Sequence, residues 1–354
     1  MSLNEFELIQ DLGKEDNISL SKVKRKKDNL IFLLKHFELR DDNEKRNAIN
    51  EIKILSNLNH PNIIEFRQSF FDKPSNSLNM LMEFPNNGNL SNKIQFVKKK
   101  EMYMEECIIW NVLTQILYGL NYIHKKGIVH RNLKSKNIFL TKSRTIKICD
   151  FNSCCILEKK QMAQTQIGTP FYTAPEIWNQ KPYNYKSDIW SLGCIIYEMA
   201  TLSLPFKGET IELLYENIMS KKYNPIPDFY SNNLKNLIDN MLSFDPSRRP
   251  SSDILLNYPK IKEITSELNS IYSNYKIISI LKNNQNLQKS NTMKIKKNNN
   301  LSLKKIPSDN INSKENSNEN LNENNLKNLI NSRNSNSVNK TKSIPKSDFD
   351  KNIK

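Results

Sequence analysis

Seven short motifs follow one another in a single order along this 354-residue chain, and together they constrain its fold more than any other feature. Each motif alone is a weak signal, but the shared order and spacing are a strong one. In chain order they are a lysine in a strand-like run, a glutamate in a helix-like run and five further segments: Lys35, Glu51, His130–Asn137, Asp150–Asn152, Ala174–Glu176, Ser187–Gly193 and Arg249-Pro250.

Apolar periodicity predicts the elements that carry these motifs. Up to about residue 85 the pattern is typical of strands around one helix, and beyond Gly88 it becomes helical. The expected elements are strands at residues 30–37, 63–71 and 78–84, and helices at 43–58, 104–124 and 185–202. His60-Pro61 is expected to stop the first helix. The last helix is apolar on nearly all sides, so we expect it to be buried.

The composition changes at about residue 270. Asn, Lys and Ser dominate from there on and aromatic residues nearly vanish, so the segment cannot bury enough apolar surface to offset its ordering entropy. We expect it to be disordered, with one short amphipathic helix over residues 321–330. Nucleotide bias in the genome is the preferred explanation of its Asn content.

Charge and cysteine content limit the partners and the compartment. The net charge of +16, from 53 Lys and Arg against 37 Asp and Glu, favours acidic partners without specifying one. The basic tail lacks the interleaved aromatic residues that stack on bases, so we interpret it as a solvated linker rather than as a site for RNA, microtubules or anionic lipid. The five cysteines lack zinc spacing, and neither a secretory signal nor a membrane-length apolar run is present, which favours the cytosol or nucleus.

The motifs resemble those of eukaryotic protein kinases over residues 5 to 262. The segments LKSKNIFL, IGTPFYTAPE and KPYNYKSDIWSLGCIIYEM are most similar to the NIMA-related (NEK) Ser/Thr kinases. The resemblance implies an α+β, two-lobed kinase fold. Its parts would be a β-rich N-lobe with one main helix over residues 1–85, a larger, mostly helical C-lobe over 86–265, and the disordered tail over 266–354. Association with the cytoskeleton is a further family-based expectation.

The same resemblance assigns ATP and Mg²⁺ as cofactors and gives roles to the retained polar residues. Lys35 would hold the nucleotide phosphates and pair with Glu51, although Glu51 could also be a solvated helix residue. Asn137 and Asp150 would be the Mg²⁺ ligands, since amide and carboxylate oxygens suit that ion. Lys134 would stabilise the transferred phosphoryl group.

Other matches are expected to hold the fold or to regulate it. Packing and anchoring roles fall to His130, Phe151, Glu176, Asp188 and Arg249, and His124 is expected to be a helix-end residue. Thr165 matches an activation-segment phosphorylation site whose phosphate Arg131 could receive, and the alternative is an unmodified surface threonine. Thr169 would bond the catalytic-loop residue and Lys134.

The catalytic loop departs from the kinase pattern at its centre. Asn132 stands where the family has the aspartate that accepts the substrate hydroxyl proton. An amide has nearly the same shape but is not a useful base near neutral pH.

The nucleotide end of the site also departs from the pattern. The segment from Gly13 to Ile18 lacks two of the three expected glycines and adds Glu15 and Asp16, whose repulsion of a polyanion is worth about 1 kcal/mol or more. The alternative for this segment, a polar hairpin turn that meets no nucleotide, stays open. Leu33 would crowd the adenine pocket at a cost of about 1–3 kcal/mol.

The expected hinge follows the gatekeeper Met82. The Glu83 carbonyl would accept a hydrogen bond from adenine, but Pro85 lacks the backbone N–H that would donate one, a loss of about 0.5–1.5 kcal/mol. Asn152 replaces a glycine. Asparagine tolerates a left-handed backbone better than most residues, so Phe151 could still reach its expected position.

We therefore interpret the chain as a NEK-like pseudokinase, or a strongly impaired Ser/Thr kinase, that acts through a protein partner. An active kinase is one candidate for that partner. Residual Mg-ATP binding stays open because the phosphate-end residues remain. The alternative is an active ATP-dependent protein Ser/Thr kinase acting on a protein substrate. Nucleic acid is not an expected partner.

Overall fold

The computed structural model describes residues 1–156 and 170–268. Thr165, Thr169, the expected helix at 321–330 and the expected disordered tail beyond residue 268 lie outside the described residues. The tail was predicted to begin at residue 266, but residues 266–268 are helical and Leu268 is buried, so that boundary was wrong. Across the two described ranges, no helix is both long enough and apolar enough to cross a membrane.

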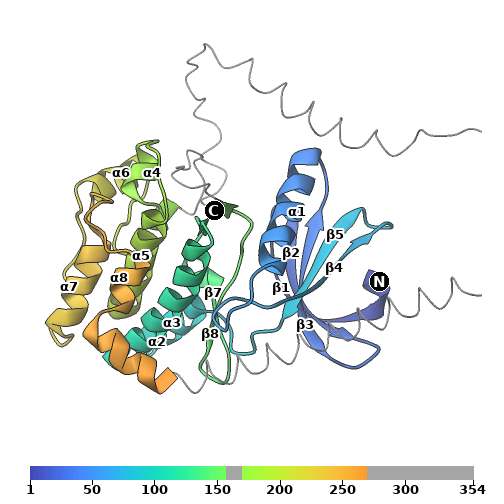
Figure 1. The fold of residues 1–354 in the computed structure, drawn as a ribbon, viewed down its shortest axis with the longest axis horizontal. Helices are drawn as coiled ribbons and strands as arrows, with labels where there is room; N and C mark the ends of the chain where they lie inside the picture. Colours follow the sequence, from blue (N-terminus) through green and yellow to red (C-terminus); the bar gives the residue numbers. More distant parts are fainter. Residues whose placement is uncertain (157–169, 269–354) are drawn as a thin grey trace, which may run out of the picture. The chain divides into compact units, whose positions relative to one another are not determined.

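A five-stranded antiparallel sheet forms the N-terminal part, with strand order β1-β2-β3-β5-β4. The strands are β1 (Phe6–Glu15), β2 (Ile18–Arg25), β3 (Ile31–Glu38), β4 (Phe66–Asp72) and β5 (Ser77–Glu83), preceded by the short helix η1 (Leu3–Glu5). Helix α1 (Asp42–Ser56) lies beside the sheet (Figure 1). The predicted strands at 30–37 and 78–84 are confirmed to within one residue at each end.

The strand predicted at 63–71 corresponds to β4, which begins at Phe66, three residues later than predicted. Ile63 and Ile64 leave the sheet and instead pair with Ile148, the end of a strand in the C-terminal part. The prediction failed here because an apolar run looks the same whether it pairs within its own sheet or with a distant segment.

Helices dominate the C-terminal part. They are α2 (Leu90–Lys99), α3 (Glu106–Lys125), α4 (Pro175–Trp178), α5 (Lys186–Thr201), α6 (Ile211–Met219), α7 (Asn232–Met241) and α8 (Ser252–Leu256), with residues 259–268 also helical. Both long helices were predicted. In α5, 13 of 16 residues are buried, which confirms the expectation of burial on most sides.

Very short strands and 3₁₀ turns lie in the loops of the C-terminal part. They are β6 (Ile128–Val129), β7 (Ile138–Leu140), β8 (Ile146–Ile148), β9 (Cys155–Ile156), and the 3₁₀ turns η2 (Ser135–Asn137) and η3 (Pro170–Tyr172). β6 pairs with β9, and β7 pairs with β8. Elements of two or three residues carry too little periodicity to be predicted from the sequence.

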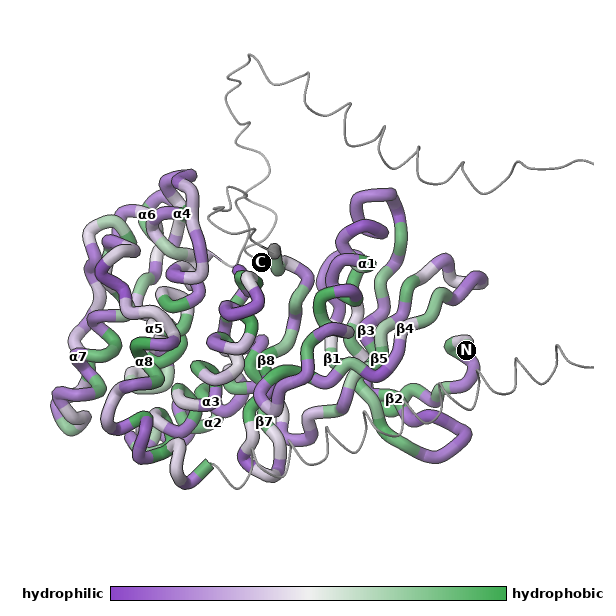
Figure 2. The backbone as a smooth tube through the Cα atoms, in the orientation of Figure 1, coloured by the Kyte–Doolittle hydropathy of each residue, from purple (hydrophilic) through white to green (hydrophobic). Residues whose placement is uncertain are grey.

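The core runs continuously through both parts. One cluster of buried side chains includes Leu33 and Phe37 from β3 together with Trp110 and Trp190 from the helices. Alternate β3 residues such as Phe32 turn to the other face of the sheet, as the two-residue strand period requires. Figure 2 shows hydrophobic and hydrophilic residues alternating along the chain, as elements around a shared core must do.

Candidate active site

A buried lysine joins two acidic residues that are far apart in the sequence. The Nζ of Lys35, on β3, lies 2.7 Å from Glu51 Oε1 on α1 and 2.9 Å from Asp150 Oδ1, just after β8. The lysine and Glu51 side chains are almost fully excluded from solvent. The structure thus brings together three of the predicted site residues.

Burial and charge act against each other in this cluster. Burial alone would raise the pKa of Asp150, but Lys35 outweighs it and lowers the pKa to about 2. Burial would lower the pKa of Lys35, but the two carboxylates raise it. Burial raises the pKa of Glu51, and repulsion from Asp150 adds to that effect while Lys35 offsets part of it. One lysine faces two carboxylates, so the cluster remains short of positive charge.

Two asparagines complete the contacts of Asp150. The Nδ2 of Asn132 donates to Asp150 Oδ2 at 2.8 Å, and the Nδ2 of Asn137 lies 3.2 Å from the same oxygen. The Asn137 amide also donates to the backbone carbonyl of Asn132 at 2.8 Å. With Lys35 on Oδ1, nitrogen atoms from three side chains therefore surround this one carboxylate.

Asp188, at the start of α5, anchors the loop that carries Asn132. Its carboxylate accepts from the backbone N–H of His130 and of Arg131, each at 2.9 Å. Arg131 has a left-handed backbone (φ 66°), a strained conformation that these contacts can hold in place.

His124 does more than end its helix. Its Nε2 lies 2.8 Å from Asp188 Oδ2, and only 6% of its side chain is exposed. His124 is in the last turn of α3, as expected, but the sequence did not indicate its contact with Asp188. No local pattern could have revealed this contact, because it joins residues 64 positions apart.

Phe151 packs beneath the loop. It is fully buried, and its ring lies 5.1 Å from that of His130 in an edge-to-face arrangement. Asn152, which was expected to use its tolerance of left-handed backbone, does not adopt a positive φ; Asp150 does, with φ 67°. The backbone reversal is therefore located two residues earlier, where the contacts of the Asp150 carboxylate hold it.

A cavity of about 440 Å³ opens beside this cluster. Leu33 and Met82 line it from the sheet, Lys134 from the loop, and Cys149 from the segment before Asp150. Its volume falls in the range of small-molecule sites. Burial raises the pKa of the Cys149 thiol, which therefore stays protonated at neutral pH.

The β1–β2 hairpin covers part of this cavity. Gly13 and Glu15 line it, and residues 16 and 17 form the two-residue turn, with Asp16 at φ 52°. Exposed ion pairs tie the tip to the end of β3: Lys14 Nζ lies 2.5 Å from Glu38 Oε1, and Arg40 lies 3.0 Å from Asp16.

The expected hinge residues do not line the cavity. The Glu83 side chain pairs with Lys147 at 2.6 Å and accepts from the backbone N–H of Glu65, whereas the expectation concerned its backbone carbonyl. Pro85 is buried. Lys147 was not singled out from the sequence, which offers no sign of a contact across 64 residues.

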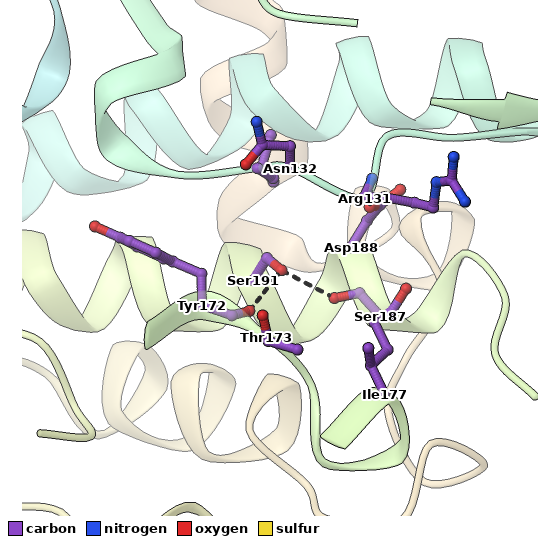
Figure 3. Close-up of a pocket in the computed structure, with 9 residues that line it drawn as sticks. Arg131, Asn132, Tyr172, Thr173, Ile177, Ser187, Asp188 and Ser191 are labelled. Carbon is purple, nitrogen blue, oxygen red and sulfur yellow. Dashed lines mark hydrogen bonds between the residues drawn. The ribbon is translucent and has the colours of Figure 1, made fainter. Parts of the chain in front are cut away.

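Below the loop lies a gap of only about 10 Å³, too small for a ligand. Figure 3 shows Asn132 and Arg131 on one side of it and Tyr172 and Thr173 on the other, with Ser191 hydrogen-bonded to the Tyr172 carbonyl. Arg131 is itself engaged, since it donates to the Ser153 carbonyl and to the Tyr183 hydroxyl.

An ion pair fixes the segment after Tyr172 to the helices. Arg249 donates to Glu176 through its two terminal guanidinium nitrogens, Nη1 and Nη2, at 2.6 and 2.7 Å, and both residues are buried. The guanidinium also stacks over the Trp190 ring at 5.0 Å.

Comparison with known proteins accounts for this arrangement. A family model described as "Protein kinase domain" matches residues 6–261. The chain belongs to the protein kinase family. It is 39% identical over 283 residues to a probable serine/threonine-protein kinase nek2 of Dictyostelium discoideum, a match that covers 77% of this chain and 67% of the relative.

Two further relatives place this kinase domain in the NIMA-related branch. It is 39% identical over 254 residues to Nek4 of Mus musculus, covering 71% of this chain and 32% of the relative. It is 33% identical over 294 residues to the G2-specific protein kinase nimA of Emericella nidulans, covering 75% and 42%. The chain therefore matches less than half of these two longer relatives.

Kinases of this family normally use ATP and Mg²⁺, and the donor set can be tested against that ion. Mg²⁺ requires oxygen ligands. Asp150 and Asn137 are the expected residue types and lie together, but Asn137 turns its amide nitrogen toward the carboxylate. Both oxygens of Asp150 already accept hydrogen bonds. The arrangement does not fit the ion.

Proposed function

We propose that this kinase domain has strongly impaired or absent phosphotransfer and acts by presenting its surface to a protein partner. The observation that carries the proposal is the contact of Asn132. At the position where the family has a proton acceptor, this side chain is a hydrogen-bond donor, aimed at Asp150 at 2.8 Å. General-base catalysis is worth about 10²–10⁴-fold in rate, so its loss alone makes a slow enzyme.

Weaker nucleotide binding adds to that loss. Glu15 and Ile18 line the cavity where phosphate contacts are expected, and Leu33 takes up room beside them. Pro85 cannot donate a backbone hydrogen bond. We propose that ATP binding persists only in weakened form.

The alternative function is an active ATP-dependent protein serine/threonine kinase. The assembled Lys35, Glu51 and Asp150 cluster favours it, as does Lys134 at the cavity wall. Under this alternative the chain would act on protein substrates. Under the first proposal it binds a protein partner, and our first candidate for that partner is an active kinase. We propose a cytoplasmic or nuclear location, with cytoskeletal association as the family-based option.

A phosphotransfer assay on the full chain distinguishes the two. The proposal predicts transfer to a generic protein substrate no greater than that of Lys35→Arg, a variant that keeps the buried positive charge. Robust transfer by the wild type that Lys35→Arg abolishes would overturn the proposal and establish the alternative. The same replacement at an exposed position, Lys222→Arg, serves as the matched control.

A further inference from the structure

The contacts of Asp150 are complete without a cation. Its Oδ1 accepts from Lys35 Nζ at 2.9 Å, and its Oδ2 accepts from Asn132 Nδ2 at 2.8 Å and from Asn137 Nδ2 at 3.2 Å. The Asn137 nitrogen is oriented by a second acceptor, the Asn132 carbonyl, so the amide does not present its oxygen to this carboxylate. Hydrogen bonds to an ionised carboxylate are among the stronger ones, so these donors stabilise the charge of Asp150 without a metal ion.

An aspartate at position 132 would reverse this situation. It would place a second carboxylate within about 3 Å of Asp150, and like charges at that distance repel strongly in a partly buried site. A proton or a cation between the oxygens of such a pair would relieve the repulsion. Asparagine removes one negative charge and supplies a donor in the same space, so a single substitution removes the need for the ion.

We propose that the amide of Asn132 takes the place of a divalent cation at Asp150, so that this site is assembled without metal and does not take up Mg²⁺. The inference goes beyond the proposed function, because it concerns what neutralises Asp150 and not whether phosphate is transferred.

Thermal unfolding of the full-length wild type tests the inference directly. Its Tm should be the same in EDTA and in millimolar Mg²⁺ or Mn²⁺. A titration of Mn²⁺ followed by electron paramagnetic resonance should detect no site on the protein. A Mn²⁺ site, or a Tm that rises with Mg²⁺, would overturn the inference.

Two variants give the opposite expectation. Asn132→Asp should unfold about 2–4 °C or more below the wild type in EDTA, and Mg²⁺ or Mn²⁺ should restore its Tm while a Mn²⁺ site appears. Asn233→Asp adds the same charge at an exposed position of α7. It should neither lower the Tm in EDTA nor create a Mn²⁺ site. Asn132→Asp that is as stable as the wild type in EDTA would contradict the inference.

Asn132→Ala keeps the test decisive if the aspartate variant does not fold. This variant removes the donor without adding charge, so its Tm should fall and Asp150 should gain measurable Mn²⁺ binding relative to the wild type. An unchanged Tm with unchanged Mn²⁺ binding would count against the inference. Phosphotransfer measured on the same samples reports separately on the proposed function, since robust Lys35-dependent transfer would overturn that proposal and leave these metal readouts unaffected.

Discussion

The Asn132 amide nitrogen lies 2.8 Å from Asp150, and this one contact changes both members of the pair. The loop loses its proton acceptor, and the carboxylate gains a donor. Restoring the acceptor therefore does not simply restore an active site, because Glu15, Ile18 and Leu33 still line the cavity.

The first prediction concerns this residue. Asn132→Asp should recover little phosphotransfer, less than the 10²–10⁴-fold that a general base typically contributes, because nucleotide binding remains weakened. Initial rates with a generic protein substrate, with and without Mg²⁺, measure the effect. A gain of the full size in the single variant would show that the cavity residues do not limit activity.

The second prediction concerns Lys35, whose side chain is 5% exposed. Lys35→Met should lower the free energy of unfolding by about 3–5 kcal/mol, because it leaves Glu51 and Asp150 facing one another without a counter-charge. Urea unfolding measures the loss, with the exposed Lys222→Met as control. A similar small loss in both variants would show that the buried cluster contributes nothing beyond a surface lysine.

Among the elements, the loop between α1 and β4 binds the sheet to the helices. The backbone N–H of Asn62 donates to His60 Nδ1 at 3.1 Å, and the His60 ring stacks on Tyr122 of α3. Burial lowers the pKa of His60 to about 4, and nearby Lys147 adds to the effect.

The third prediction follows from that pKa. Between about pH 6.5 and 4 the unfolded chain takes up a proton at His60 and the folded chain does not, so the free energy of unfolding falls as the pH falls, by at most about 3 kcal/mol. Urea midpoints at pH 7 and pH 4.5 measure the decline. His60→Asn should decline less over the same window, and an equal decline in both proteins would exclude His60 as the cause.

The sequence predicted long elements well and contacts between them poorly. Helices α3 and α5 and strands β3 and β5 carry enough periodic residues to be located within one or two positions. The contacts of His124 and Lys147 were missed because their partners, Asp188 and Glu83, lie 64 residues away in the sequence. Distance in the sequence hides such contacts, whatever the residue type.

The candidate site was predicted unevenly for the same reason. The resemblance named Lys35, Glu51, Asp150 and Asn137, and the structure brings them together; their roles remain predictions. It could not show that Asn132 would donate to Asp150. That contact depends on how two loops approach, and no motif records it.

Over the whole molecule, the two parts are joined by buried contacts rather than by a linker alone. Ile64 bonds Ile148 through the backbone, and the Asn62 side chain, fully buried, donates to Gln115 and to the Ile146 carbonyl. The continuous core described above adds to these contacts.

The fourth prediction is therefore a single cooperative unfolding transition for residues 1–268 within the full chain. Calorimetry should give equal calorimetric and van't Hoff enthalpies. Asn62→Ala should lower Tm and raise the ratio of the calorimetric to the van't Hoff enthalpy above one. Asn233→Ala should change neither the Tm nor this ratio. A wild type that already unfolds in two steps would show that the joining contacts are too weak to couple the two parts.

The ion pairs at the tip of the β1–β2 hairpin have a consequence for how quickly a ligand enters. Arg40 and Asp16 are largely exposed, as are Lys14 and Glu38 to a lesser degree, and exposed pairs are screened by salt. At low ionic strength the hairpin is held down over the cavity. Added salt weakens its attachment without touching the buried cluster, so association and dissociation of an uncharged ligand should both become faster while its affinity changes little.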